Sequence, residues 1–214
     1  MIRAVLFDMD GVLVDSESFI CRAAVAMFSE LGVKVVEKDF VPFIGTGENR
    51  YIGGVAELYG INIDIGKAKS RTYEIYSQLV RGNLTPLPGA TDFIGRCRNH
   101  GLKISLATST DRVKMEINLR EIGLDAKSFD SIITGADVVN KKPFPEIYLK
   151  AADSLNIPAE SCLVVEDAVN GVEAGKRAGC RCLAVTNTFS VQDLKAADWI
   201  CESLLDVPGE ALEW

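Results

Sequence analysis

The chain has 214 residues, of which 48% are hydrophobic and 25% charged, and its formal net charge is −7 at pH 7. This length allows one domain with a large insertion or two small domains, and the composition is typical of soluble globular proteins. The negative charge argues against nucleic acid or an anionic membrane as a partner. No apolar run approaches the roughly 20 residues of a membrane span, and Asp8 and Asp10 interrupt the N-terminal apolar run where a signal peptide would continue.

The cysteines and the single histidine, His100, argue against two further kinds of site. The six cysteines contain no Cys-x-x-Cys pair, so a zinc site is not expected. Most of them lie in or beside apolar runs, where free cysteine behaves as a small hydrophobic residue, and none has a histidine near it in sequence. We therefore predict a reduced, cytoplasmic protein without a catalytic cysteine.

The first predicted strand, residues 4–7, leads directly into Asp8-Met9-Asp10-Gly11. Two close carboxylates repel each other, so they normally need a cation between them or a shared proton. Oxygen ligands of this kind suit Mg²⁺ better than Zn²⁺. One aspartate could attack phosphorus while the other handles a proton, although Asp and Gly also favour an ordinary turn.

The stretch from residue 16 to about residue 82 is predicted to be helical throughout. Its helices are expected at residues 20–31, 49–59 and 68–80, and they are closed by Gly32, Gly60 and Gly82. A helical block of this length is too long for a crossover between two strands of an α/β sheet. We therefore predict a core domain made of residues 1–15 and 83–214, with residues 16–82 inserted as an all-helical domain.

Beyond residue 87, short apolar runs alternate with helical stretches. The strand-like runs occupy residues 103–107, 131–134, 162–165 and 181–185. The helical stretches occupy residues 112–122, 146–155 and 171–178. Strand, helix and strand repeated in this way predict an α/β fold with a Rossmann-like parallel sheet and helices on both faces.

Polar residues follow several of these strands. They are Asp8 and Asp10 after the first, Thr108, Ser109 and Thr110 after the second, and Glu166 and Asp167 after the fourth, with Lys141 and Lys142 in the loop before a helix. In open α/β sheets, ligands bind beyond the carboxyl ends of the strands. Carboxylates, hydroxyls and a lysine at one edge are what a Mg²⁺-assisted phosphoryl transfer needs.

Four segments, at residues 8–17, 106–110, 142–148 and 164–171, resemble in order and spacing the motifs of the haloacid dehalogenase superfamily of phosphohydrolases. The chain is similar in particular to the subgroup with a helical cap after the first strand. That subgroup includes the β-phosphoglucomutase-like and phosphoglycolate phosphatase-like proteins. The resemblance covers essentially the whole chain and implies the fold of that superfamily, a Rossmann-like core with a helical cap.

The resemblance also implies roles for individual residues. Asp8 would be the nucleophile that forms an aspartyl-phosphate, and Asp10 the general acid and then the base, for which it needs a raised pKa. The residues that would hold the phosphoryl oxygens are Thr108, Ser109, Thr110 and Lys142, with Lys141 as the alternative to Lys142. The residues that would bind Mg²⁺ are Asp8, Asp10 through its backbone carbonyl, Asp167 and Glu166, the last either as a ligand or as a partner of a ligand.

The second aspartate, Asp10, favours transfer from an ester oxygen, because the dehalogenases and phosphonoacetaldehyde hydrolases of this superfamily lack it. The β-phosphoglucomutases carry a histidine in the first cap helix and an arginine in a cap loop. Ile20 and Glu48 stand at the matching positions here, although Arg50 is close by. We therefore predict a Mg²⁺-dependent phosphatase for a small phosphorylated metabolite, with a sugar phosphate as the expected substrate and a β-phosphoglucomutase-type mutase as the alternative.

Residues 43–49 are interpreted as a substrate-specificity loop, with a simple loop leading into a helix as the alternative. Glu48 or Asn49 could accept hydrogen bonds from substrate hydroxyls or an amine, and Arg50 is a further candidate for substrate binding. Two alternatives to a phosphatase come from other classes of function: a receiver domain of a signalling protein, and a protein that only binds a partner. Nothing in the sequence demands a dimer, so we expect a monomer that acts on a small-molecule phosphate ester.

Overall fold

The structure, a computed structural model, describes residues 1–44 and 47–214. The predicted specificity loop includes residues 45–46, and this part of it lies outside the described residues. The centre of the fold is a six-stranded sheet with the strand order β3-β2-β1-β4-β5-β6, in which every pair of neighbours is parallel. The strands are β1 (Ala4–Phe7), β2 (Lys103–Ala107), β3 (Ser131–Ile133), β4 (Cys162–Glu166), β5 (Arg181–Val185) and β6 (Trp199–Cys201). The predicted α/β fold class is confirmed.

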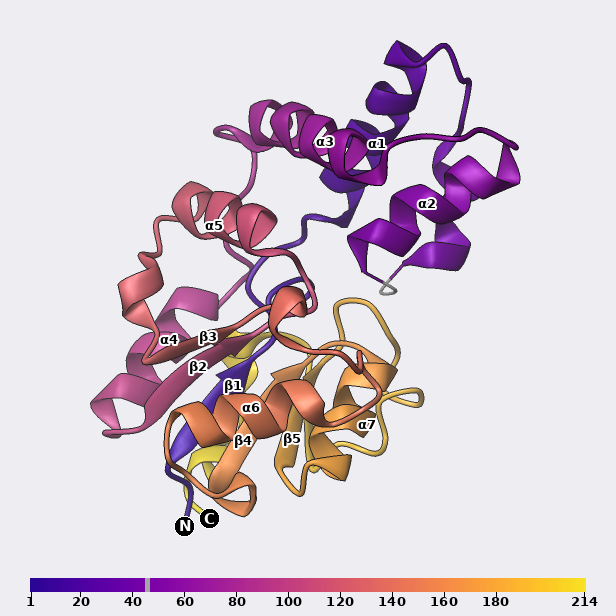
Figure 1. The fold of residues 1–214 in the computed structure, drawn as a ribbon. Coiled ribbons are helices and arrows are strands. Elements are labelled where there is room, and N and C mark those ends of the chain that lie inside the picture. Colours follow the sequence, from indigo (N-terminus) through magenta and orange to yellow (C-terminus); the bar gives the residue numbers. More distant parts are fainter. Residues whose placement is uncertain (45–46) are drawn as a thin grey trace.

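Helices cover both faces of this sheet, as the continuous apolar strands require. They are α4 (Ala90–Asn99), α5 (Arg112–Glu121), α6 (Glu146–Ser154) and α7 (Val169–Arg177). Because side chains alternate along a strand, Leu6 of β1 belongs to the apolar cluster that includes α6 and α7, whereas Phe7 belongs to the opposite cluster, where its ring packs edge-on against Phe93 of α4. Figure 1 shows α6 and α7 on one side of the strands and α4 on the other.

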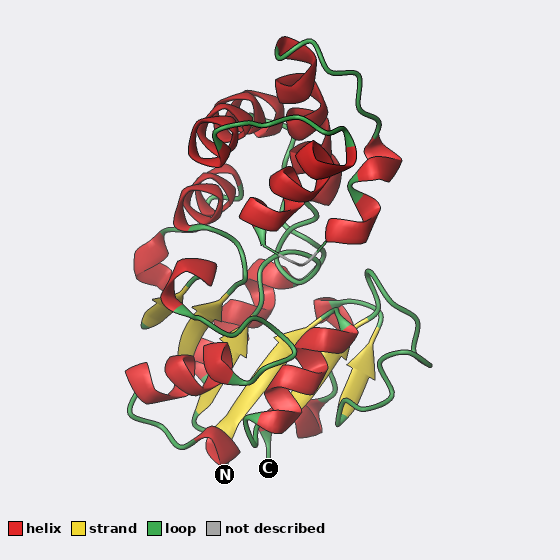
Figure 2. Ribbon diagram, turned by 45° about the vertical axis from the view of Figure 1, so that its right-hand side comes forward, coloured by secondary structure: helices red, strands yellow, loops and turns green. Residues whose placement is uncertain are grey.

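Three further helices, α1 (Glu17–Glu30), α2 (Glu48–Leu58) and α3 (Ile65–Val80), form a block above the sheet layer (Figures 1 and 2). The buried side of α1 follows the helical spacing seen in the sequence, with Ile20, Ala24 and Phe28 facing inward. The apolar cluster that contains Phe7 continues into this block. The helices therefore pack on the sheet layer through a shared core.

Short 3₁₀ helices complete the chain. They are η1 (Glu37–Asp39), η2 (Val41–Phe43), η3 (Ala126–Ser128), η4 (Gly135–Asp137), η5 (Ala159–Ser161), η6 (Leu204–Asp206) and η7 (Gly209–Leu212). Among the described residues, none of the helices combines the length and the hydropathy that a membrane span needs.

Several helices begin or end one to three residues away from their predicted bounds, and one strand was not predicted. Helix α3 begins at Ile65 rather than residue 68, because the Asp64 side chain accepts a hydrogen bond from the backbone N–H of Lys67 at 3.0 Å and caps the helix. Strand β6 was not predicted, since its three residues are too few to show a periodic pattern. Its place at the edge of the sheet depends on pairing with β5, which is a tertiary contact.

Candidate active site

Register brings the polar residues together at one edge of the sheet. Phe7 lies beside Leu106 of β2 and Val165 of β4, so the residues that follow all three strands emerge side by side. The backbone N–H of Asp8 continues the ladder by donating to the Val165 carbonyl at 3.0 Å. The Asp8 side chain is therefore fixed at the central strand end, where it is 7% exposed.

Lys142 reaches this edge from the loop before α6. Its Nζ lies 2.5 Å from Asp8 Oδ1 and 2.6 Å from Glu166 Oε1. Lys141 instead donates to the backbone carbonyl of Gly135. Of the two candidate lysines, Lys142 is thus the one that contacts the predicted nucleophile.

Asp8, Glu166 and Asp167 form a buried acidic cluster, with one oxygen of each within 4.8 Å of the others. Burial raises the pKa of Asp8 to about 7, with Lys142 opposing this shift and Glu166 adding to it. Burial also raises the pKa of Asp167 to about 8, helped by the charges of Glu166 and Asp8. One lysine does not neutralise three buried carboxylates, and an all-oxygen donor set of this kind fits a hard divalent cation such as Mg²⁺.

Glu166 is held by four donors. Oε1 accepts from Lys142 and from the Tyr148 hydroxyl at 2.7 Å, and Oε2 accepts from the backbone N–H groups of Asp167 and Ala168 at 3.0 and 3.1 Å. Gly171 makes room for this carboxylate, because a Cβ atom there would lie 1.8 Å from Oε1. With both oxygens engaged, Glu166 orients Lys142 and the turn after β4.

Asp167 is oriented from two sides. Its Oδ2 accepts from the Thr188 hydroxyl. Gly11 approaches it closely, at a left-handed φ of 78°, and a Cβ on Gly11 would lie 1.9 Å from Oδ2. The Gly11 carbonyl in turn accepts from Asn187 Nδ2 at 2.7 Å. Asn187 and Thr188 were not predicted, although they follow β5 and the rule used for the other strand ends could have found them.

Asp10 lies in a different environment from the one predicted. Its Oδ1 accepts from the Ser16 hydroxyl, and its Oδ2 accepts from the Thr110 hydroxyl and from Lys114 Nζ, both at 2.8 Å. Burial would raise the pKa of Asp10, but the Lys114 charge and these hydrogen bonds outweigh it, so the pKa is lowered. This direction is opposite to the raised pKa predicted for Asp10, because that prediction considered neighbouring carboxylates and not Lys114.

Lys114 was missed by the sequence reading. It is 3% exposed and lies in the first turn of α5, where Asp111 stands at the N-cap. Lys114 lies in the first turn of the predicted helix of residues 112–122, close to the polar residues after β2, and this closeness is the signal that could have pointed to it. Most lysines at such positions are solvated, so spacing alone does not identify this one.

The predicted phosphate-holding residues after β2 have distinct surroundings. Thr108 is 2% exposed, and its Oγ1 accepts from the backbone N–H of Thr110 at 3.1 Å. Ser109 is half-buried between them. The Thr110 hydroxyl donates to Asp10, so in this structure it holds the predicted acid rather than pointing to a phosphate site.

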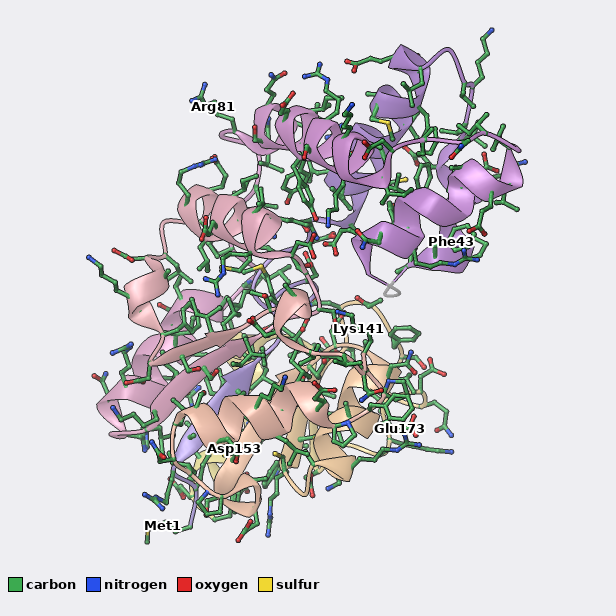
Figure 3. The ribbon with its side chains drawn as sticks, in the orientation of Figure 1. Met1, Phe43, Arg81, Lys141, Asp153 and Glu173 are labelled. Carbon is green, nitrogen blue, oxygen red and sulfur yellow. The ribbon has the colours of Figure 1, made fainter. Side chains whose placement is uncertain are left out.

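The three residues predicted to bind substrate from the helical block have different partners in the structure. Glu48 reaches the sheet layer, where its Oε1 accepts from the backbone N–H of Asp111 at 3.4 Å. Asn49 Oδ1 accepts from Lys69 at 3.0 Å. Arg50 pairs with Glu57 at 2.7 Å on the exposed side of α2, away from the acidic cluster. Figure 3 shows Phe43 in the helical block and Lys141 in the sheet layer below it, so the two layers face each other across this region.

Comparisons with known proteins agree with this geometry. The sequence model of the haloacid dehalogenase-like hydrolases matches residues 5–185. The chain is 45% identical over 199 residues to the chloroplastic protein SUPPRESSOR OF QUENCHING 1 of Arabidopsis thaliana, covering 92% of this chain but 19% of that protein. It is 34% identical to the phosphorylated carbohydrates phosphatase of Thermotoga maritima, covering 83% of this chain and 82% of that protein.

Solved structures show the same fold. CbbY from Rhodobacter sphaeroides in complex with phosphate superimposes with a TM-score of 0.89 at 28% identity, covering 100% of both chains. A mutant of that protein in complex with xylulose-1,5-bisphosphate gives a TM-score of 0.88, also at 28% identity and covering 99% of both chains. The family and the enzyme class predicted from the motifs are thus confirmed, and the chain belongs to the haloacid dehalogenase-like hydrolases.

Proposed function

We propose that this protein is a Mg²⁺-dependent phosphatase that hydrolyses a small phosphorylated metabolite, with a sugar phosphate as the expected substrate. The observation that carries this proposal is Asp8 at the central strand end, within 2.5 Å of Lys142 and in one acidic cluster with Asp167. The Thermotoga relative, named for phosphorylated carbohydrates, supports the substrate class.

The proposed reaction has two steps. An Asp8 oxygen attacks phosphorus while Asp10 donates a proton to the ester oxygen that leaves, which gives an aspartyl-phosphate and a free alcohol. Asp10 then takes a proton from water, whose oxygen attacks phosphorus and breaks the bond to Asp8, releasing inorganic phosphate. Since Asp10 is a carboxylate paired with Lys114 here, it has to take up a proton from solvent before the first turnover, and the proton that it takes from water in the second step then serves the next turnover.

The chain's own residues position the phosphate and the cation. Lys142 offsets charge on the phosphoryl oxygens, and Thr108 and Ser109 provide donors at the adjoining strand end. Asp8, Asp167 and the Asp10 backbone carbonyl would hold Mg²⁺, which supplies further positive charge beside the phosphoryl group when bound. Glu166, with both oxygens already engaged, is better suited to orient Lys142 than to bind the metal directly.

We further propose that residues 16–82 act as a cap domain on the core of residues 1–15 and 83–214, in a monomer. Closure of such a cap would exclude water around Asp8 and bring Glu48 toward the substrate. The hydrogen bond between Glu48 and Asp111 supports this arrangement, because it already joins α2 to the N-terminus of α5.

The test is phosphate release from a panel of sugar phosphates, nucleotides, phosphoglycolate and pyrophosphate, with Mg²⁺ and with EDTA. We expect metal-dependent release that Asp8→Asn abolishes, while Asp153→Asn, an exposed aspartate on α6, keeps wild-type activity. Full activity of Asp8→Asn would exclude the mechanism. Conversion of β-glucose 1-phosphate to glucose 6-phosphate without net phosphate release would identify a mutase instead.

A further inference from the structure

We infer that the helical block screens substrates by charge, because Glu17 and Glu48 place two carboxylates on the cap side of Asp10. They favour monophosphate esters whose alcohol carries hydrogen-bond donors, hydroxyl or amine, and they reject a second phosphate. This inference rests on the proposed function, since it concerns the alcohol that leaves when Asp10 donates its proton.

Glu48 comes from α2 to the surroundings of Lys114, the partner of Asp10. It is the first residue of that helix, it is half-buried, and its Oε1 accepts from the Asp111 backbone N–H at 3.4 Å. Asp111 occupies the N-cap position of α5, the helix that carries Lys114. Glu48 therefore lies near enough to Lys114 to interact with its charge.

Glu17 comes to the same place from α1. It is the first residue of that helix and directly follows Ser16, whose hydroxyl donates to Asp10 Oδ1. Glu17 is half-buried and interacts electrostatically with Asp10, Lys114 and Glu48. Two helix N-termini thus deliver one carboxylate each to the side of Asp10 that faces the cap.

The neighbouring cations are already paired with other carboxylates. Lys114 is 2.8 Å from Asp10, and Lys69 is 2.6 Å from Asp111. Arg50, the cap arginine nearest in sequence, pairs with Glu57. Within the part of the chain that the structure describes, these contacts leave the surroundings of the leaving group with an excess of negative charge.

Two further observations point to a ligand with hydrogen-bond donors. Burial raises the pKa of both Glu17 and Glu48, and nearby carboxylates add to this, while Lys114 opposes it together with Tyr51 at Glu17 and backbone N–H groups at Glu48. Tyr51 is a residue 6% exposed, and its hydroxyl lies close to Glu17 and to the Cys21 thiol, although among the described residues it forms no hydrogen bond of normal geometry. A hydroxyl-bearing or amine-bearing substrate would supply donors to these carboxylates, and a hydroxyl could also accept from Tyr51.

A second phosphate at this position would bring like charges together in a half-buried site, where such contacts are strongly disfavoured. The wild-type protein should therefore show at least a tenfold higher kcat/KM for fructose 1-phosphate than for fructose 1,6-bisphosphate, and glucosamine 6-phosphate should be turned over at least as well as glucose 6-phosphate. The ratio of the two kcat/KM values should fall toward one as the salt concentration rises, because the discrimination is electrostatic.

The decisive variant is the double substitution Glu17→Gln and Glu48→Gln, which keeps shape and removes both charges. We expect it to lower the ratio of kcat/KM for fructose 1-phosphate to kcat/KM for fructose 1,6-bisphosphate at least fivefold, mainly by raising kcat/KM for the bisphosphate. Glu30→Gln is the matched control, since Glu30 is an exposed acid of α1 that pairs with Arg71, and it should leave the ratio unchanged. Melting curves of all variants check that the fold is kept.

A calorimetric measurement of how tightly each of the two fructose esters binds to the Asp8→Asn protein in Mg²⁺ separates this inference from the proposed function. Tighter binding of the monophosphate, lost in the double variant, supports the charge screen even if the wild-type protein hydrolyses no ester, in which case the proposed function fails alone. Metal-dependent hydrolysis with equal binding of both esters, or a preference that the double variant retains, overturns the charge screen and leaves the phosphatase intact.

Discussion

At the scale of single residues, the ion pair between Asp10 and Lys114 is the contact on which the proposed chemistry most depends. Lys114 is buried, and Asp10 accepts two hydroxyl hydrogen bonds in addition to the lysine. Removing one partner of a buried pair leaves the other charge uncompensated, which costs about 3–5 kcal/mol when nothing else stabilises it. The hydroxyls of Ser16 and Thr110 should reduce that loss without replacing Lys114.

We therefore predict that Lys114→Met lowers kcat by at least about tenfold, because general acid–base catalysis contributes about 10²–10⁴ and requires a correctly placed group. KM should change less, since Lys114 contacts Asp10 rather than the predicted phosphate site. Steady-state kinetics on the best substrate of the panel measures both constants. Arg120→Met, an exposed position on the same helix, is the control. An unchanged kcat in Lys114→Met would show that the pair does not position Asp10.

At the scale of elements, the N-terminus of α4 is held against the C-terminal part of the chain. Gly89 is the N-cap of α4 with a left-handed φ of 79°, and a Cβ there would lie 2.4 Å from the Leu205 backbone nitrogen. Gly101, just after the same helix, has a left-handed φ of 71°, and a Cβ there would meet none of the described residues within 4 Å. The two glycines thus share a backbone conformation but differ in packing.

Gly89→Ala should therefore lower the free energy of unfolding more than Gly101→Ala. Both variants carry the left-handed penalty of about 1–2 kcal/mol, and Gly89→Ala adds an overpacking cost of about 1–3 kcal/mol against η6. Urea denaturation monitored by circular dichroism measures the free energy of unfolding of both variants. Equal destabilisation would mean that η6 moves aside at little cost.

At the scale of the whole molecule, buried apolar residues tie the sheet layer to the helical block, while the acidic cluster concentrates negative charge at the sheet edge below that block. The N- and C-termini meet at the opposite end, where the Ile2 N–H donates to the Trp214 carbonyl at 2.7 Å (Figure 1). The fold is thus tied together at one end, and a cation would relieve the charge at the other.

Mg²⁺ should consequently raise the melting temperature, since a ligand that binds only the folded state stabilises it by about 2.7 kcal/mol at 100 times its Kd. EDTA should reverse the shift. Asp167→Asn should abolish most of it, whereas Asp153→Asn should retain it, because only Asp167 belongs to the acidic cluster. Thermal melting at increasing Mg²⁺ concentration gives the answer, and the absence of any shift in the wild-type protein would argue against the metal site.

The sequence by itself determined the parallel sheet, the helical insertion and the edge where Asp8, Glu166 and Asp167 gather, but left Lys141 and Lys142 as alternatives. These features follow from local patterns, because apolar runs mark strands and the carboxyl ends of parallel strands share one edge. Only the tertiary structure decided which groups surround each of these side chains. Lys114, Thr188 and Arg50 could each have faced solvent or the site, and how the helices and loops dock determines their partners, which spacing along the chain does not encode.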